Sequence, residues 1–157
     1  MTDRTDPGGA THPRVAVADE QTRPIDVDAL TAFAERALDA AAVPAGHVLS
    51  LALVDRPAIA ELNGRYHGER KPTDVLSFTM DPLDAPGPAM LGDVVICVSI
   101  AERHARALGL PLRRELEHLV VHGILHLTGR DHADPGDEIA MAREERRILG
   151  EATAVAS

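Results

Sequence analysis

The chain has 157 residues, one cysteine and a formal net charge of −9, which indicate a single domain with a substantial core and exclude a disulfide framework. The lone cysteine suits a reducing cytoplasm. No apolar run reaches the roughly 20 residues of a membrane span, and the first residues do not resemble a signal peptide. The acidic balance disfavours binding to nucleic acid through a global positive field, so RNA would need a local basic patch.

The first half of the chain alternates predicted strands and helices. Residues 1–13 are polar and rich in proline and glycine, and we expect a flexible leader there. Alternating valines predict a short strand at 14–18. Asp26 is a plausible N-cap for an amphipathic helix from Val27 to about Ala42, and an apolar run predicts a second strand at 48–54.

The middle of the chain predicts a short helix, two strands and two loops. Asp55-Arg-Pro57 is a helix start, and we expect that helix to end at Leu62, with a loop from Asn63 to Thr73. A brief strand follows at 75–78, and the prolines of 81–88 indicate an exposed loop. Residues 91–98 form the clearest central strand.

The last third of the chain is mainly helical. Ser99 is expected to cap a helix to about Leu108, and a long helix is predicted from about Leu112 to Leu127. Asp134-Pro135 opens a last helix to about Leu149, followed by a frayed tail at 151–157. The whole pattern predicts an α+β fold: one domain over 14–150, with a small mixed sheet of about four strands packed with helices and a metal site at the end of a long helix.

The segment His122-Gly-Ile-Leu-His126-Leu-Thr-Gly129-Arg-Asp-His132 has the spacing of a metal site. Residues i and i+4 of a helix share one face, so His122 and His126 can reach one ion. Gly129 suits the left-handed position that ends a helix, and the returning chain can then bring His132 to the same ion. Three nitrogen ligands leave Zn²⁺ one open position, which is typical of a catalytic site. Apolar neighbours indicate a mostly buried helix, in which a histidine needs a partner.

Two separate motifs give the chain a resemblance to a known family. The histidine segment, together with Pro72-Thr-Asp-Val-Leu-Ser-Phe78 and the following Leu91-Gly-Asp-Val-Val-Ile-Cys97, resembles the YbeY family of bacterial single-strand-specific endoribonucleases. The resemblance covers roughly residues 14–150. It implies a cytoplasmic, zinc-dependent hydrolase, with one zinc held by His122, His126 and His132. It also implies a role in 16S ribosomal RNA 3′-end maturation and late ribosome quality control, with ribosomal RNA and the small subunit as partners.

Basic residues near Tyr66 are candidates to bind the phosphate of an RNA substrate. Members of the family often have a functional arginine after the tyrosine that aligns with Tyr66, and this chain has His67 there. Arg65 and Arg70 lie close by in sequence and can bind phosphate oxygens through two guanidinium nitrogens. The residue that binds phosphate therefore stays open among these three, while Tyr66 is a candidate to stack a base.

Further polar residues are candidates for supporting roles. Asp131 precedes the third histidine and could orient a ligand, accept a proton or hold the turn after Gly129. Thr73, Asp74 and Ser77 are candidates to line the cleft. His104 and His47 are expected to be exposed and without a role. Other acidic residues are expected to lie away from the metal: Asp3, Asp6, Asp19, Glu20, Glu138, Glu144, Glu145 and Glu151.

Two rival functions share the same histidines. The spacing also matches that of the metzincin proteases, which place a glutamate base directly after the first histidine, whereas this chain has Gly123. Glycine has no side chain to take a proton, which disfavours peptide hydrolysis. The second rival is a non-catalytic ribosome-assembly factor, in which Asp131 or His67 would complete a closed structural zinc site.

Overall fold

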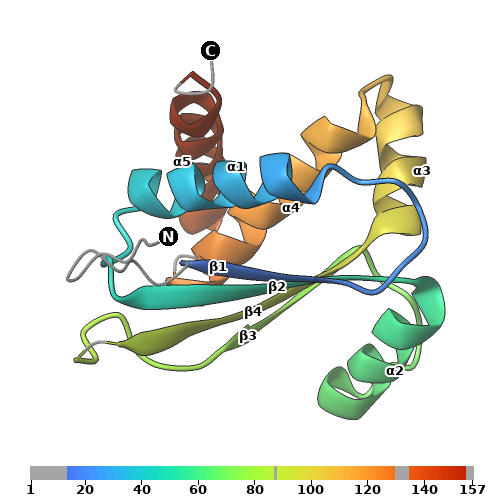
Figure 1. The fold of residues 1–157 in the computed structure, drawn as a ribbon, viewed down its shortest axis with the longest axis horizontal. Coiled ribbons are helices and arrows are strands. Elements are labelled where there is room, and N and C mark those ends of the chain that lie inside the picture. Colours follow the sequence, from blue (N-terminus) through green and yellow to red (C-terminus); the bar gives the residue numbers. More distant parts are fainter. Residues whose placement is uncertain (1–13, 87, 130–134, 155–157) are drawn as a thin grey trace, which may run out of the picture.

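The computed structural model describes residues 14–86, 88–129 and 135–154. Over these ranges the chain forms five helices and one four-stranded mixed sheet (Figure 1), which confirms the predicted α+β class. The predicted leader at 1–13 lies outside the described ranges. No helix within them is both long and apolar enough to cross a bilayer.

The sheet has the strand order β1-β2-β4-β3. Strands β1, β2 and β4 are parallel, while β3 joins β4 in antiparallel orientation and forms one edge. In chain order the elements are β1 Val15–Asp19, α1 Val27–Ala40, β2 His47–Val54, α2 Arg56–His67, β3 Val75–Thr79, β4 Ala89–Cys97, α3 Val98–Leu108, α4 Leu112–Leu127 and α5 Pro135–Ala154.

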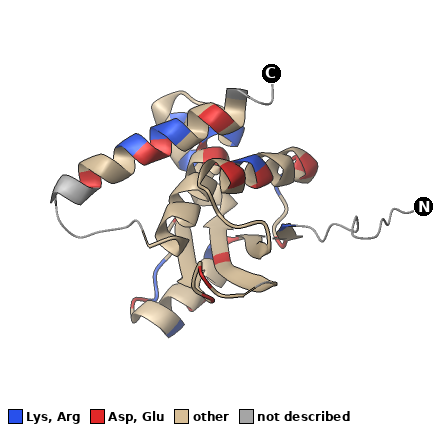
Figure 2. Ribbon diagram, turned by 90° about the vertical axis from the view of Figure 1, so that its left-hand side faces the viewer, with Lys and Arg blue, Asp and Glu red and all other residues tan. Residues whose placement is uncertain are grey.

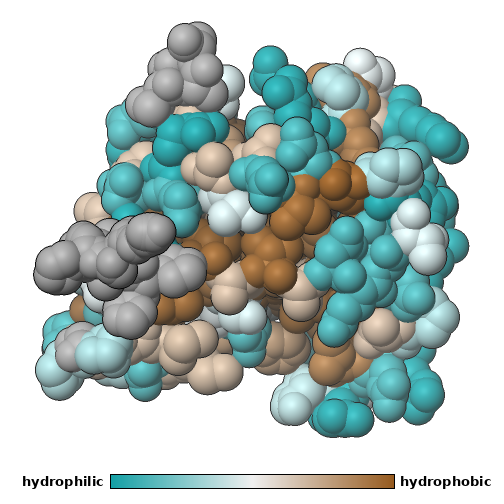
Figure 3. Space-filling model, in the orientation of Figure 1, coloured by the Kyte–Doolittle hydropathy of each residue, from teal (hydrophilic) through white to brown (hydrophobic). Residues whose placement is uncertain are grey.

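The two faces of the sheet carry separate apolar clusters. Side chains alternate along a strand, so Val94 and Ile96 of β4 join the larger cluster with α1, α4 and α5, and Val95 and Cys97 join the smaller one. Ile59 of α2 covers part of the smaller cluster. Figure 3 shows apolar surface across the middle of one face of the molecule, surrounded by hydrophilic side chains. The larger cluster packs around α4 and is the main core.

Helix α4 lies in the middle of this core and follows the predicted bounds at both ends. Its apolar side chains Val120, Val121, Ile124 and Leu125 are fully buried. The helix ends where Gly129 adopts a φ of +77°, the left-handed conformation predicted for it. Burial from Glu115 to Leu127 holds α4 in one position, and with it the two histidines near its C-terminal end.

Gly123 is the point of closest approach between α4 and the sheet. A Cβ atom at this position would lie 2.6 Å from Cγ2 and 2.8 Å from Cγ1 of Val94, which is fully buried in β4. A buried valine between a helix and a strand has little room to move. The absence of a side chain at Gly123 therefore permits this helix–sheet contact.

We expect Gly123→Ala to lower the free energy of unfolding by about 1–3 kcal/mol, because the added methyl group overpacks against Val94. Gly150→Ala is the matched control, since a Cβ there meets nothing within 4 Å and the position is exposed on α5. That control should stabilise the protein by roughly 0.5–1 kcal/mol through helix propensity alone. Urea denaturation of both variants measures the difference, and equal effects would contradict the packing argument.

Helix α2 is longer than predicted, and this difference changes the surroundings of three candidate residues. The prediction that it ends at Leu62 is wrong: it continues to His67, and Gly68 ends it with a φ of +78°. Asn63, a poor helix residue in isolation, is buried and donates a hydrogen bond from its side-chain amide to the carbonyl of Lys71. Tertiary contacts thus overcome local propensity, and Arg65, Tyr66 and His67 lie on a helical turn instead of a loop.

Three smaller predictions also differ from the structure. The N-cap of α3 is Cys97 instead of Ser99, and it makes no side-chain capping hydrogen bond. Helix α5 continues to Ala154, past the predicted end at Leu149, and Ala152 is buried against the core. His47, expected to be exposed, is only 1% exposed and its Nε2 lies 3.1 Å from the carbonyl oxygen of Pro82. Burial of these positions depends on elements distant in sequence.

Candidate metal centre and cleft

Two histidines near the C-terminal end of α4 direct their rings at one another. The Nε2 atoms of His122 and His126 are 2.8 Å apart, and their ring centroids are 4.4 Å apart. This arrangement follows from the i, i+4 spacing on one helical face. At this distance the two nitrogens share a hydrogen bond, and with a small increase in their separation they would supply two of the four ligands of a tetrahedral zinc site. His132, the third predicted ligand, lies outside the described residues, as does Asp131.

Glu145 of α5 contacts one member of this pair, His122, at its other ring nitrogen. One carboxylate oxygen of Glu145 lies 2.7 Å from Nδ1 of His122, and the other lies 3.4 Å from Nε2 of His118. The carboxylate accepts the Nδ1 proton of His122, so Nε2 of this ring carries the lone pair, which accepts the hydrogen bond from Nε2 of His126 and would serve as the donor to a metal. The prediction that Glu145 lies away from the site is wrong. Imidazole ligands, one of them hydrogen-bonded to a carboxylate through its other nitrogen, are a donor set that fits zinc.

The electrostatics of Glu145 reflect two opposing effects. Burial alone would raise the pKa of this carboxyl, but the hydrogen bonds with His118 and His122 lower it to about 2, from an ordinary value of 4.5. The hydrogen bond to Glu145 likewise raises the pKa of His118 above 6.5, against the effect of its own burial. Both partners of the His118–Glu145 pair are therefore charged between pH 4.5 and pH 6.5.

The stability of the metal-free protein should depend on pH through Glu145. Because its folded pKa is depressed from 4.5 to about 2, its stabilising contribution is complete above pH 4.5 and is lost as the pH falls toward 2. We expect wild type to exceed Glu145→Gln by up to about 3 kcal/mol near pH 5.5. The gap should shrink steadily below about pH 4. Urea denaturation of both proteins in chelator, at several pH values, measures it; a gap that does not change with pH would contradict the assignment.

An open cleft lies between the histidine pair, the edge strand β3 and the end of α2. His122 and His126 line it together with one further histidine and four residues of β3: His67, Val75, Leu76, Ser77 and Thr79. The ring of His67 stacks on Phe78, with centroids 6.0 Å apart, and Tyr66 meets the same ring edge-on at 5.1 Å. Phe78 thus holds the end of α2 against β3, and places His67 in the cleft.

A second group of possible metal ligands lies at the other end of α4. Asp74, His104 and Glu115 each offer one donor atom, and these atoms lie within 4.8 Å of one another. His104, to which the sequence assigned no role, thus belongs to a cluster with two carboxylates. The described residues therefore contain one possible metal-binding cluster besides the histidine pair of α4.

Comparison with known proteins identifies the family. The family profile described as Endoribonuclease YbeY matches residues 16–153, almost the whole chain. The chain belongs to the endoribonuclease YbeY family. The predicted resemblance is confirmed, and so is the predicted enzyme class, a nuclease.

Several relatives of the YbeY family match over most of their length. The Endoribonuclease YbeY of Beutenbergia cavernae is 43% identical over 139 residues, which cover 85% of this chain and 93% of that protein. The Thermobifida fusca protein of the same name is 43% identical over 141 residues, which cover 86% of this chain and 91% of that protein. The solution structure of TM1509 from Thermotoga maritima superposes with a TM-score of 0.63 at 26% identity, covering 88% of each chain. The fold is thus shared with a solved structure.

The structure separates the candidates for phosphate binding in this YbeY-family chain. His67 lines the cleft with the two histidines of α4, whereas Arg65 and Arg70 are exposed outside the lining residues. Arg65 is paired with Glu61 at 3.5 Å on α2. The stem of Arg70 packs on the backbone of Gly64, where a Cβ would lie 3.1 Å from Cβ of Arg70. Ser77 lines the cleft as expected, while Asp74 turns toward His104 at 3.6 Å.

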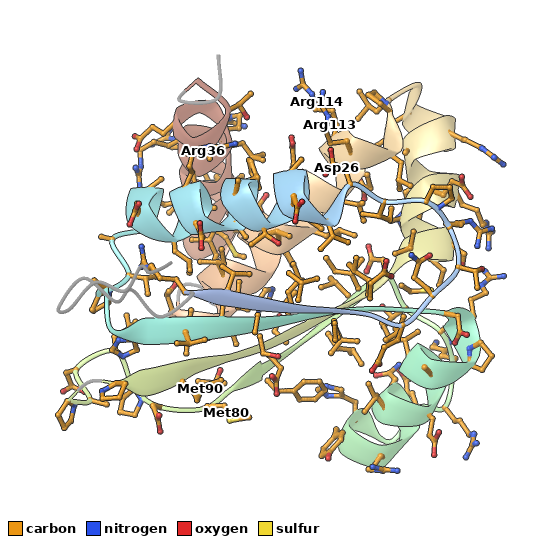
Figure 4. The ribbon with its side chains drawn as sticks, in the orientation of Figure 1. Asp26, Arg36, Met80, Met90, Arg113 and Arg114 are labelled. Atoms are coloured by element: carbon orange, nitrogen blue, oxygen red, sulfur yellow. The ribbon has the colours of Figure 1, made fainter. Side chains whose placement is uncertain are left out.

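Other charged residues are distributed without a broad basic face in the part of the chain that is described. Figure 2 shows both signs of charge interspersed along the helices and few charges on the strands. Arg113 and Arg114 lie in the first turn of α4, at the end opposite His126, and Figure 4 shows them far from Met80 and Met90. Among the described residues, the basic side chains closest in sequence to His67 of the cleft are Arg65, Arg70 and Lys71.

Proposed function

We propose that this chain cuts single-stranded RNA internally with the help of one zinc ion held by His122, His126 and His132. The observation that carries this proposal is the convergence of the two Nε2 atoms, 2.8 Å apart, with Glu145 accepting the proton of His122 Nδ1. Membership of the endoribonuclease YbeY family supports RNA as the substrate. The acidic charge of the chain makes a local site, instead of a global field, the basis of RNA binding.

The residues around the histidine pair divide the work of catalysis. Zinc, when bound, would supply a Lewis acid that acidifies water and stabilises negative charge on phosphate. Glu145 holds His122 in one tautomer and one orientation, which keeps its Nε2 directed at the ion. His67 lies across the cleft, where it can donate a hydrogen bond to a phosphate oxygen. Asp131, next to the third ligand, is proposed to orient it or to accept a proton.

The shape of the cleft favours a single strand. Its wall is β3, the edge strand of the sheet, and the exposed ring of Tyr66 stands beside it on the last turn of α2. An exposed aromatic ring can stack on one unpaired base. A base inside a duplex is already stacked between its neighbours and is not available to the ring. Met80, which follows the last residue of β3, and Met90, near the start of β4, add exposed apolar surface at this end of the two strands (Figure 4).

The proposed biological role follows the family resemblance. We place the activity in the cytoplasm, in maturation of the 16S ribosomal RNA 3′ end and in late quality control of ribosomes. The partners would then be ribosomal RNA and the small ribosomal subunit. A single-stranded RNA end held by a folded particle would fit an open cleft that accepts one strand.

The proposal is tested by cleavage of an end-labelled RNA that contains single-stranded and duplex segments. Zinc-loaded protein should cut within the single-stranded segments, and a chelated sample should not cut. Adding zinc back to the chelated sample should restore cleavage. Equal cleavage with and without chelator would overturn the metal dependence, and equal cleavage of both segments would overturn the strand preference.

We expect the phosphate-binding candidates to differ in their effect on cleavage. His67→Ala should lower kcat/KM by roughly 10–100-fold, because a hydrogen bond to a charged group contributes about 1.5–3 kcal/mol. Arg70→Ala and Arg65→Ala, made separately, should act mainly through KM, by a few-fold, since both side chains are exposed. Steady-state kinetics on one RNA measures all three. A larger effect of Arg70→Ala than of His67→Ala would reassign the phosphate contact to Arg70.

A further inference from the structure

Three side chains from separate elements meet at the end of α4 remote from the cleft. Asp74 directly precedes β3, His104 lies in α3, and Glu115 lies in the first turn of α4. The Nδ1 atom of His104 lies 3.6 Å from Oδ2 of Asp74 and 3.8 Å from Oε2 of Glu115. All three donor atoms are within 4.8 Å of one another. The sequence separation of these residues makes their meeting a property of the fold.

The separations of these atoms exceed those of hydrogen bonds. A charge-assisted N–H to carboxylate contact closes to about 2.7–2.9 Å, and a contact at 3.6 Å is not a hydrogen bond. Two ligand atoms each about 2.1 Å from one ion, at angles of roughly 110–130°, are about 3.4–3.8 Å apart. The two measured distances fall within that range or at its upper end. The two distances from His104 therefore match the spacing of ligands around a common ion, and the Asp74 and Glu115 oxygens lie within 4.8 Å of one another.

Glu115 supplies an independent indication. Its side chain is more than nine-tenths buried, yet no described residue forms a hydrogen bond with its carboxylate. Its partners among those residues are His104 at 3.8 Å and His118 at 4.0 Å, one at each oxygen. A carboxylate buried to this extent is stabilised by a cation beside it. The carboxylate is directed toward His104, where the other two donors meet.

We propose that Asp74, His104 and Glu115 bind a divalent transition-metal cation, such as Mn²⁺ or Zn²⁺, at a second site. Two carboxylate oxygens and one imidazole nitrogen suit these ions, and the larger share of oxygen accommodates Mn²⁺ better than a site of three histidines does. Glu115 and His122 are seven residues apart on α4, which is roughly 10 Å along the helix axis. Two-metal catalytic centres hold their ions about 3.5–4 Å apart, so this cation is separate from the cleft.

The position of the second site gives it a structural consequence for the cleft. Asp74 is fixed by its carbonyl, which accepts a hydrogen bond from the backbone N–H of Cys97 at 2.9 Å. The next residues of the chain form β3, which supplies Val75, Leu76, Ser77 and Thr79 to the cleft. A cation on Asp74 would join the start of this strand to α3 and α4. The second site thus holds the wall of the cleft against the helix that carries the histidine pair.

The test isolates the second site by removing the first. In the full chain carrying His122→Ala and His126→Ala, Mn²⁺ alone should bind with one equivalent per chain. Electron paramagnetic resonance and thermal unfolding measure this binding. Saturating Mn²⁺ should raise Tm by roughly 5–10 °C in this background. Adding His104→Gln should abolish both signals. His104 is half-exposed, so this change leaves the fold intact.

Matched variants distinguish this site from weaker surface binding. Asp74→Asn should also abolish the Mn²⁺ signal, whereas Glu102→Gln, on the same helix as His104, should leave it unchanged. Zn²⁺, measured by calorimetry in the same background, should give the same pattern. Absence of stoichiometric binding of either metal in the double-alanine background would overturn the proposal. Binding that survives both His104→Gln and Asp74→Asn would overturn it too, and neither result depends on RNA cleavage.

Discussion

His126→Ala is expected to reduce RNA cleavage by roughly 10³-fold or more while leaving the fold in place. The variant removes one of the converging Nε2 atoms, and loss of a ligand should weaken metal binding by more than the roughly 10–100-fold typical of an outer partner. His126 is partly exposed on a helix whose apolar face makes the core, so its removal leaves that face unchanged. Single-turnover cleavage of a labelled RNA measures the loss.

Arg113→Ala is the control for this variant. Arg113 lies on the same helix, is exposed, and stands near the opposite end from His126. It should retain cleavage within about two-fold of wild type, as surface changes away from a site usually do. Circular dichroism and urea denaturation establish that both variants fold. Full activity in a folded His126→Ala protein would remove this histidine from the metal site.

Glu145→Gln is expected to weaken zinc binding by roughly 10–100-fold. The amide can still occupy the space, but it lacks the negative charge that orients His122 and increases the basicity of its Nε2. Cleavage should therefore fall when zinc is limiting and recover largely when zinc is in excess. Competition with a chelator of known affinity measures the shift, and zinc titration of the cleavage rate measures the recovery.

Glu144→Gln is the neighbouring control for the role of Glu145. Glu144 forms an ion pair with Arg147 on the surface of α5, at 2.6 Å, one residue from Glu145. The zinc affinity of this variant should stay within about two-fold of wild type, because an exposed ion pair contributes little. A shift as large in Glu144→Gln as in Glu145→Gln would show a general effect of charge on α5 instead of a specific contact with His122.

Local sequence patterns were sufficient to predict the elements whose own residues carry a clear helix or strand signal. Helix α4 has an apolar face, two histidines at helical spacing and Gly129 after its end, and its bounds follow the prediction. Strand β4 was likewise recognised from its apolar run. Helix α2 shows the opposite case, because Asn63 and Gly64 look like breakers until Lys71 and Arg70 are placed against them. Contacts across a turn are invisible to a local pattern.

The remaining parts of the site depend on long-range contacts. Glu145 belongs to a run of charged residues on α5, and nothing in that run indicates which carboxylate faces His122, 23 positions earlier. The same holds for Asp74, His104 and Glu115, which three separate elements bring together. His67 was a candidate from the sequence, but its place in the cleft depends on the stacking of its ring against Phe78. The spacing of two ligands within one helix can be recognised in the sequence, whereas the side chains that other elements bring to those ligands cannot.

The contact between Gly123 and Val94 limits the evolutionary routes open to this chain. A metzincin-type glutamate base would occupy position 123, directly after the first histidine. The space at this position is filled by the two methyl groups of Val94, 2.6 Å and 2.8 Å from where a Cβ would lie. Acquiring that base would require a smaller residue at Val94, or a helix displaced from the sheet, before the new side chain could be accommodated. Ancestral change from one chemistry to the other would thus pass through a destabilised intermediate, which selection for stability would remove.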